Sequence, residues 1–274
     1  MELAELSRLG SLMFSKTLAI VALAGVALTS AQAAFVYGLS TGTDSGIFKI
    51  DVTTGNTTLV HNLAHAGTLN NGTTNGLARD AATGDFYYRS TDKKLYRVNG
   101  SGETLVGTLS GAASAATFYN GSYYYIAEGS NKVRRVNVAS FSDTLFGTPS
   151  GLVASSYGDI AAKTNGEFYG ASSHGFYQAS LTSISSPAVY KSSNTGNLQL
   201  GLYNNTSLYG IDTSADKVYS INASTGVKTL TSTLTNGSRL FITDAAAAQA
   251  VPEPASMIAL GLGAAAMIRR RRKA

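Results

Sequence analysis

The chain contains no cysteine and no tryptophan, and only 4 prolines and 3 histidines among its 274 residues. Without cysteine it has no disulfides and no thiolate chemistry. Charged residues make up only 14% of the chain, whereas hydrophobic residues make up 44%, and that hydrophobic content excludes a chain that is disordered by composition. The chain is instead rich in glycine, with 29 residues, and in tyrosine, with 15.

The formal net charge of +5 comes from the ends of the chain. Arg269, Arg270, Arg271, Arg272 and Lys273 stand together near the C-terminus. Between residues 34 and 250 there are 14 basic and 13 acidic residues, so the middle of the chain is nearly neutral. A neutral domain lacks the basic patch of a nucleic-acid-binding protein, and nucleic acid is therefore not an expected partner.

The first 33 residues have the organisation of a secretory signal peptide. Lys16 precedes an apolar run over residues 17–28, and Ala31 and Ala33 follow it. A basic start, a short apolar core and two small residues are the features that signal peptidase recognises. The run is shorter than the roughly 20 residues of a membrane span, so a permanent anchor or a first buried helix fits it less well. We expect cleavage after Ala33, with Met13 as an alternative start of translation.

The last residues, 249–274, contain three parts in a fixed order. Val251-Pro252-Glu253-Pro254 comes first, an apolar run follows, and the cationic cluster ends the chain. The two prolines keep the segment before the apolar run extended, because a proline has no backbone N–H to donate to a helical hydrogen bond. Residues 256–268 predict a short transmembrane helix, whose length is less than the thickness of a hydrocarbon core of about 30 Å. The arginines are expected to stay on the cytoplasmic side of the membrane.

These three parts closely resemble the PEP-CTERM sorting domain. The resemblance implies an exported protein of a Gram-negative bacterium that secretes extracellular polysaccharide, as in a biofilm. It implies an inner-membrane intermediate that an exosortase, a transpeptidase-like membrane enzyme, cleaves near Pro252–Pro254. The mature protein would then lie at the cell surface or in the extracellular matrix. A plain tail anchor is the alternative, and the resemblance implies nothing about the domain that precedes the tail.

The middle of the chain repeats. Tyr37, Tyr87, Tyr125, Tyr169 and Tyr209 are spaced by 50, 38, 44 and 40 residues. Each lies in an aromatic run that is followed, after a cluster of Gly, Ser, Asp or Asn, by a second β-prone run. Two such runs predict a β-hairpin. A third β-prone run follows each hairpin, starting at Thr57, Thr104, Thr144, Ala188 and Lys228.

A strand of small residues precedes four of the five hairpins, as in Gly76–Arg79, Ala115–Thr117, Asp159–Ala161 and Gln199–Leu202. Four strands in a repeat of about 43 residues form a β-propeller blade, with the small residues at the crowded centre. Turns such as Asp51–Gly55 are similar to those of quinoprotein-like and NHL-like propeller repeats. The resemblance therefore implies the fold and no particular ligand.

The first repeat lacks its small-residue strand, because Phe35 lies at the expected start of the mature chain. We expect Arg239–Thr243 to supply the missing strand, so that the two ends of the domain pair in one sheet and close the ring. The prediction is an all-β domain over residues 34–248, a propeller of five four-stranded blades. A solenoid of stacked hairpins is the alternative.

No motif in the middle of the chain indicates catalysis, a cofactor or a metal. His61 and His65 are four residues apart, but they lie in a loop and not on a helix, so the spacing does not predict a metal pair. His174 is expected in a hairpin turn. Six aspartates could offer turn oxygens to calcium, but without a dense acidic run they are better explained as turn caps: Asp44, Asp51, Asp80, Asp85, Asp212 and Asp216. We expect no cofactor.

The tyrosines favour a binding function, because their rings and hydroxyls can contact sugars, although packing between blades explains them equally well. The main hypothesis is an exported, non-enzymatic protein that binds polysaccharide or another matrix component. A secreted propeller hydrolase or lyase acting on matrix polysaccharide, and a scaffold without a ligand, are the alternatives. Clustered carboxylates or histidines at the channel mouth would indicate an enzyme, whereas an uncharged face of Tyr and Asn would indicate binding.

Overall fold

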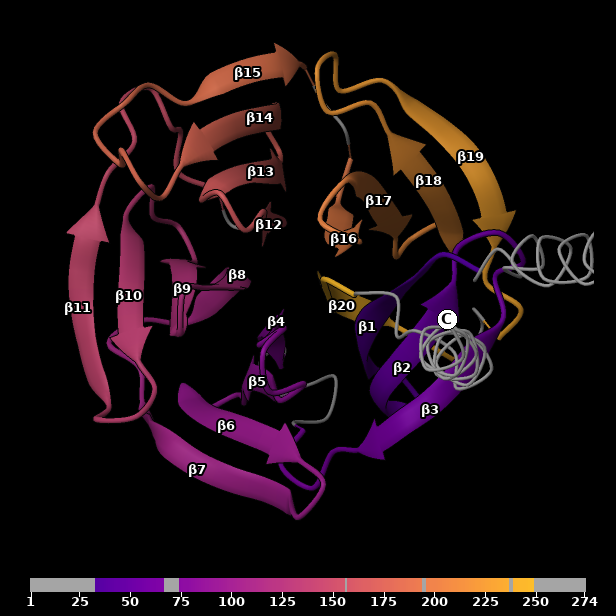
Figure 1. Ribbon diagram of the computed structural model, residues 1–274. Helices are drawn as coiled ribbons and strands as arrows, with labels where there is room; N and C mark the ends of the chain where they lie inside the picture. Colours follow the sequence, from indigo (N-terminus) through magenta and orange to yellow (C-terminus); the bar gives the residue numbers. More distant parts are fainter. Residues whose placement is uncertain (1–32, 67–73, 156, 194–195, 237–238, 249–274) are drawn as a thin grey trace, which may run out of the picture. The chain divides into compact units, whose positions relative to one another are not determined.

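The computed structural model describes residues 33–66, 74–155, 157–193, 196–236 and 239–248. In these residues the chain forms five four-stranded antiparallel sheets, arranged around a central axis as the blades of a propeller (Figure 1). No helix of the described residues is long and apolar enough to cross a membrane. Apart from Ala33, the expected signal peptide lies outside the described residues, as does the sorting segment 249–274 with its expected helix at 256–268.

Each blade places its four strands in order from the axis outwards. The first three blades are β20 (Ile242–Ala246), β1 (Phe35–Thr41), β2 (Ser45–Asp51) and β3 (Thr57–Asn62); β4 (Asn75–Arg79), β5 (Phe86–Arg89), β6 (Lys94–Asn99) and β7 (Gly102–Thr108); and β8 (Ala113–Tyr119), β9 (Ser122–Ala127), β10 (Val133–Asn137) and β11 (Ser142–Gly147). The last two are β12 (Gly158–Ala162), β13 (Glu167–Ser172), β14 (Gly175–Ser180) and β15 (Val189–Ser192); and β16 (Leu198–Tyr203), β17 (Ser207–Asp212), β18 (Lys217–Ile221) and β19 (Lys228–Thr233). The predicted five-bladed, all-β propeller is therefore confirmed.

The ring closes through the two ends of the described chain. β20 pairs antiparallel with β1, with Ala246 opposite Tyr37 and Asp244 opposite Leu39. The expected closing strand, Arg239–Thr243, lies three residues too early at both ends. Residues 239–241 instead contact the end of β1 and the loop after it, where the Phe241 carbonyl accepts a 3.0 Å hydrogen bond from the Thr41 amide and the Arg239 carbonyl accepts one of 3.2 Å from the Asp44 amide. The alanines of β20 occupy the axis because only small side chains fit where the blades converge.

The outermost strand of every blade carries a register shift at the same place. The shift falls where Phe48 pairs with Leu59, Tyr96 with Leu105, and Tyr219 with Leu230, and equivalent shifts occur in the other two blades. A bulge in an edge strand interrupts its ladder and discourages pairing with another molecule. The bulge in each repeat therefore discourages the exposed edge of its outermost strand from pairing with another molecule.

Candidate functional site

The innermost strands all run in the same direction along the axis, so their ends meet at two mouths. The start mouth is the cavity of about 420 Å³ at their first residues, which include Asn75, Ser114, Gly158 and Gln199. The end mouth is the cavity of about 490 Å³ at their last residues, which include Arg79, Tyr119 and Ala162. Both volumes lie in the range of small-molecule sites.

Two aspartates meet on the axis between the mouths. Asp159 on β12 and Asp244 on β20 are fully buried and hydrogen-bonded to each other. The Asp159 carboxyl also accepts from the amides of Ile160 at 2.6 Å, Leu200 at 2.7 Å and Ala245 at 3.2 Å. The pair thereby joins β12 to the innermost strands of two other blades.

The Asp244 carboxyl extends these connections to a further blade. It accepts from the amide of Leu77 on β4 at 2.9 Å and from the amide of Ala245 at 2.8 Å. Burial raises the pKa of Asp159 to about 7, although its hydrogen bonds act in the opposite direction. Burial, followed by the charge of Asp159, raises the pKa of Asp244 well above its ordinary value. The pair therefore retains a proton at a pH at which an exposed aspartate has lost it.

The axis is nearly filled on the end-mouth side of this pair. The remaining space there is only about 10 Å³ and is lined by small and apolar side chains such as Ala116, Ala161 and Ala245. A cavity of that size is at or below the limit for a single water molecule. The start mouth and the end mouth are thus two distinct cavities that share no lining residue.

The start mouth carries two exposed aromatic rings. Tyr157 precedes β12 and Phe241 precedes β20, and each is 44% exposed. Both lie outside the repeated strand positions, on the connections between blades. Exposed rings at the rim of a cavity offer flat apolar faces on which a sugar ring can stack.

The inner wall of the start mouth is mainly polar and uncharged. Gln199 is 3% exposed and donates to the Asn197 side-chain oxygen at 3.0 Å, while its own side-chain oxygen is buried with no hydrogen-bond partner among the described residues. Arg89, which is 5% exposed, donates to the carbonyls of Ala113 and Ser90. An arginine has five donors, and the other two of Arg89 form no hydrogen bond with the described residues.

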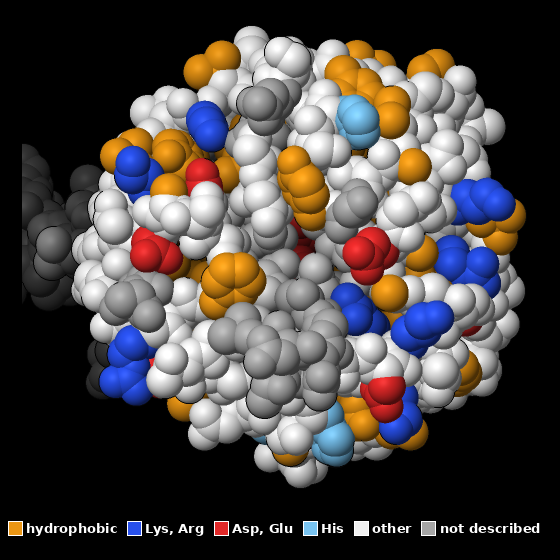
Figure 2. All heavy atoms as spheres, turned by 180° about the vertical axis from the view of Figure 1, so that it is seen from behind, with side chains coloured by type: hydrophobic (Ala, Val, Ile, Leu, Met, Phe, Trp, Pro, Cys, Tyr) orange, Lys and Arg blue, Asp and Glu red, His pale blue; other side chains and the backbone are white. Residues whose placement is uncertain are grey.

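Glu128 is the one carboxylate among the described residues that line the start mouth. The polar lining of the start mouth also includes Asn75, Thr91, Ser114, Thr213 and Thr243. Figure 2 shows one face of the molecule, where Lys and Arg side chains are interspersed with Asp and Glu and do not form one field of charge. The described lining of the start mouth contains no cluster of carboxylates or histidines, but with Arg89 and Glu128 it is also not the uncharged face of Tyr and Asn expected for a binding protein.

The five repeated tyrosines do not form a sugar-binding face. Tyr87, Tyr125 and Tyr169 are buried between strands, and Tyr37 and Tyr209 are partly buried against core clusters. Packing between blades therefore explains them. The exposed tyrosine of the start mouth, Tyr157, does not belong to the repeat.

His61 and His65 converge on a carboxylate of the neighbouring blade. His61 Nε2 lies 3.2 Å from Glu103 Oε1, and His65 Nδ1 lies 2.6 Å from Glu103 Oε2. The Tyr88 hydroxyl at 2.7 Å and the Ala64 amide at 2.8 Å donate to the same carboxylate. His61 lies on β3 and not in the expected loop, whereas His65 follows the strand, so the cluster connects β3 and the segment after it to β7. No group of side chains that could hold a metal ion is found among the described residues.

We expect replacement of Glu103 by Gln to lower the free energy of unfolding at pH 7 by about 1–3 kcal/mol, because buried donors lose a charged acceptor. Burial raises the pKa of Glu103, but hydrogen bonds from His65, Tyr88, the Ala64 amide and His61 outweigh it and hold the pKa below its usual value. The stabilisation is therefore present above a pH of about 4.3 and is lost as the pH falls below it. Denaturant unfolding at pH 7 and pH 3 measures the difference.

Glu128→Gln serves as the control for this comparison, since Glu128 forms no ion pair with the described residues. It is expected to change stability by less than about 0.5 kcal/mol at either pH. An equal loss in both variants, or a Glu103→Gln penalty that persists unchanged at pH 3, would contradict the role given to Glu103.

The other residues singled out in the sequence serve local structure. His174 lies in the turn between β13 and β14, as predicted, with Nε2 3.2 Å from the Ala154 carbonyl. Asp51, Asp80 and Asp212 accept hydrogen bonds from backbone amides two residues on, which is the expected turn cap. Two further aspartates face arginines instead: Asp44 bonds Arg239, and Asp85 lies near Arg97.

The start mouth and the aspartate pair were not identified from the sequence. Asp159 is expected, and found, on an innermost strand, but its pairing with Asp244 required the closed ring. A usable signal was present, since an aspartate stands one or two residues before a pair of alanines in both Asp159-Ile-Ala-Ala and Asp244-Ala-Ala. An acidic residue in a strand of small residues at the axis indicates a buried carboxyl group.

Comparisons with known proteins bear on the tail and on the core separately. The family model of the PEP-CTERM protein-sorting motif matches residues 250–273, so the resemblance of the tail is confirmed. The match includes Val251, Pro252, Glu253 and Pro254 together with the arginines 269–272. The signal implies an exported protein that reaches the cell surface through the membrane and is processed by an exosortase. No curated protein sequence matches the chain.

Solved structures with similar folds include two lyases and an extracellular complex. Virginiamycin B lyase from Staphylococcus aureus is 14% identical, with 77% of this chain and 74% of that chain covered and a TM-score of 0.44. A streptogramin B lyase is 13% identical, with 77% and 72% covered and a TM-score of 0.45. A chain of the nidogen/laminin complex is 10% identical, with 80% and 82% covered and a TM-score of 0.49. These similarities transfer no substrate, partner or activity to this chain.

Proposed function

We propose that the protein is an exported matrix or cell-surface protein whose propeller binds polysaccharide at the start mouth. The observation that carries the proposal is the combination of two exposed aromatic rings, Tyr157 and Phe241, with a polar wall in one cavity of about 420 Å³. The sorting signal supports it by directing the protein to a polysaccharide-rich surface.

The wall offers both hydrogen-bond donors and acceptors, and recognition of sugar hydroxyls uses both. Gln199 presents a buried acceptor without a partner, Arg89 retains two donors, and Glu128 offers a carboxylate. A buried acceptor without a hydrogen bond costs free energy, and a ligand hydroxyl would recover it. Neighbouring hydroxyls on a sugar ring can satisfy a donor and an acceptor together, while the ring face stacks on Tyr157 or Phe241.

The same lining favours binding of a polysaccharide over its hydrolysis. Hydrolysis of a glycosidic bond ordinarily uses two carboxyl groups on either side of the bond. The described lining of the start mouth supplies one, Glu128, and the Asp159–Asp244 pair is fully buried. We expect no release of reducing ends when the protein is incubated with a polysaccharide that it binds, and steady release would support the alternative of a secreted enzyme.

A glycan-array screen of the mature protein, followed by calorimetry with the best oligosaccharide, tests the proposed site. Tyr157→Ala and Phe241→Ala are each expected to weaken binding about 2- to 10-fold through lost ring contacts. Leu145→Ala is the control, because Leu145 is similarly exposed, at 54%, but lies on the outermost strand β11. Unchanged affinity in both aromatic variants, or an equal loss in the control, would refute the start mouth as the site.

We further propose that cleavage near Pro252–Pro254 removes residues 256–274 from the mature protein. An extended backbone is what a transpeptidase cleft can bind, and the two prolines enforce it. Changing Pro252-Glu253-Pro254 to alanines is expected to block cleavage and leave the tail in the inner membrane. Intact-mass measurement of protein from a polysaccharide-producing host decides this, because recovery of the tail on the mature wild-type protein would indicate a plain anchor.

A further inference from the structure

We propose that the end mouth is a second ligand site, which binds the carboxylate or sulfate group of an acidic saccharide through Arg79. This site is separate from the start mouth and does not depend on the function proposed for it. The two cavities have no lining residue in common, so a variant in one can be tested without altering the other.

Arg79 is an unpaired cation held in a fixed orientation. Its guanidinium lies over the rings of Tyr37, at 5.3 Å, and Phe86, at 5.7 Å. Its Nε is buried without a hydrogen-bond partner, and no carboxylate of the described residues forms an ion pair with it. These ring contacts use none of the donors of the guanidinium, so its terminal amino groups remain for a planar oxyanion. A hydrogen bond from a charged donor to an anionic oxygen would stabilise the bound group.

The neighbouring carboxylate does not compensate Arg79. Asp80 follows it directly and lines the same cavity. However, the Asp80 carboxylate accepts from the Ala82 amide at 2.9 Å and from the Thr83 hydroxyl at 3.0 Å. Asp80 keeps its negative charge, but its oxygens bond the turn after β4 and it forms no ion pair with Arg79.

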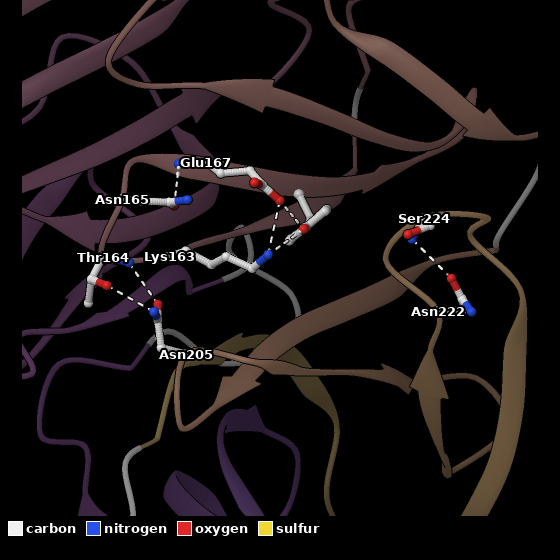
Figure 3. A network of polar contacts seen from close by, with 8 residues as sticks. Lys163, Thr164, Asn165, Glu167, Asn205, Asn222 and Ser224 are labelled. Carbon is white, nitrogen blue, oxygen red and sulfur yellow. Dashed lines mark hydrogen bonds and ion pairs between the residues drawn. The ribbon is translucent and has the colours of Figure 1, made fainter.

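A second cation reaches the cavity from the blade of β12. Lys163 donates to Glu167 at 3.0 Å and to the Tyr169 hydroxyl at 2.7 Å (Figure 3). An ammonium group has three donors, so one remains for a ligand. Glu167 neutralises the charge of Lys163, so Arg79 is the unpaired cation of the cavity and Lys163 adds a hydrogen-bond donor from a different blade.

The rest of the cavity suits a saccharide better than a bare ion. Asn205 holds the rim, since its oxygen accepts from the Thr164 amide at 2.7 Å and its nitrogen donates to the Thr164 hydroxyl at 2.8 Å (Figure 3). Tyr119 and Asn120 add an aromatic ring and an exposed amide to the lining. A volume of about 490 Å³ leaves room for sugar rings around the anionic group.

Calorimetric titration of the mature protein tests this site with four probes: a uronic-acid oligosaccharide, a sulfated oligosaccharide, a neutral oligosaccharide and inorganic sulfate. At least one acidic oligosaccharide is expected to bind, and Arg79→Gln is expected to weaken it about 10- to 100-fold. Arg135→Gln is the matched control, since it removes the same charge from an exposed arginine that lies over the Phe146 ring at 5.5 Å, away from both mouths. The control is expected to change affinity less than about 3-fold.

A second variant guards against misfolding of Arg79→Gln. Asn120→Asp adds a negative charge at an exposed turn whose backbone conformation aspartate tolerates. It is expected to lower the affinity for the acidic oligosaccharide about 2- to 5-fold. Tyr157→Ala in the start mouth is expected to leave this affinity unchanged. Equal losses in Arg79→Gln and Arg135→Gln, binding of inorganic sulfate alone, equal binding of the neutral probe, or loss of the acidic ligand in Tyr157→Ala would each overturn the proposal.

Discussion

Raising the pH from 4.5 to 7 is expected to lower the free energy of unfolding of this protein by at least about 3 kcal/mol, through the Asp159–Asp244 pair alone. In the unfolded chain both carboxyl groups have lost their protons above a pH of about 3.9. In the folded chain burial raises the pKa of Asp159 to about 7 and that of Asp244 well above its ordinary value. The folded state therefore binds at least one more proton than the unfolded state throughout this range.

The sign of the effect follows from that difference. Each additional proton held by the folded state lowers stability by about 1.4 kcal/mol per pH unit. The contribution of the protonated aspartate pair to the free energy of unfolding is fully present below a pH of about 3.9. It is lost as the pH rises through the pKa values that the pair has in the folded state. The opposite behaviour of Glu103 and Glu167, whose pKa values lie below the usual one, is confined to more acidic solutions. Denaturant unfolding at several pH values between 4.5 and 7 measures the slope.

Variants of Asp159 and Asp244 test whether the pair causes the dependence of the free energy of unfolding on pH. Replacing both Asp159 and Asp244 by Asn removes the titrating groups, and the slope between pH 4.5 and 7 is expected to disappear. Asp80→Asn, which changes a turn aspartate near the end mouth, is expected to leave the slope intact. A wild-type free energy of unfolding that is constant or rises with pH over this range would show that the pair carries no shared proton.

The second large effect concerns the strand that closes the ring. A chain that ends at residue 238 lacks β20 and is expected to aggregate or to melt far below the full domain. The deletion removes the buried Leu240 and Ile242, each contributing about 1.5–3 kcal/mol. It also exposes an edge of β1 and leaves Asp159 without its partner. The contributions of Leu240 and Ile242 together are a large share of a typical free energy of unfolding of about 5–15 kcal/mol.

A chain that ends at residue 248 is the control for this truncation, because it retains β20. It also retains the hydrogen bond from the Ala248 amide to the Leu202 carbonyl, at 2.6 Å. We expect it to melt at the temperature of the mature protein in circular dichroism. Equal melting temperatures for the two truncations would show that the ring does not depend on β20.

The fold was predictable because its information is local and repeated. Alternating aromatic runs, Gly- and Asn-containing turns and small-residue strands recur in each repeat, so one blade predicts the others. The exception is β20, which begins and ends three residues later than expected. Its alanines continue into the alanine-rich segment before Pro252, and nothing in composition separates a strand at a crowded axis from the start of a tail.

The candidate sites were less predictable, because they arise only when distant segments meet. Asp159 and Asp244 face each other through ring closure, which the sequence indicates without giving the register. Tyr157 and Phe241 lie on connections between blades, outside the tyrosine repeat that the sequence makes conspicuous. The unpaired state of Arg79 depends on the neighbouring turn, which occupies Asp80, and on the two rings that hold the guanidinium.

Chemical-shift mapping of the mature protein by nuclear magnetic resonance, with the best oligosaccharide from the glycan array, tests the central claim most directly. The claim is that the propeller binds polysaccharide at the start mouth. The result expected is a set of saturable shift changes at Tyr157, Asn197, Gln199 and Phe241, with the outermost strands unchanged. Changes confined to the outermost strands or to the end mouth, or no saturable change at any oligosaccharide concentration, would contradict it.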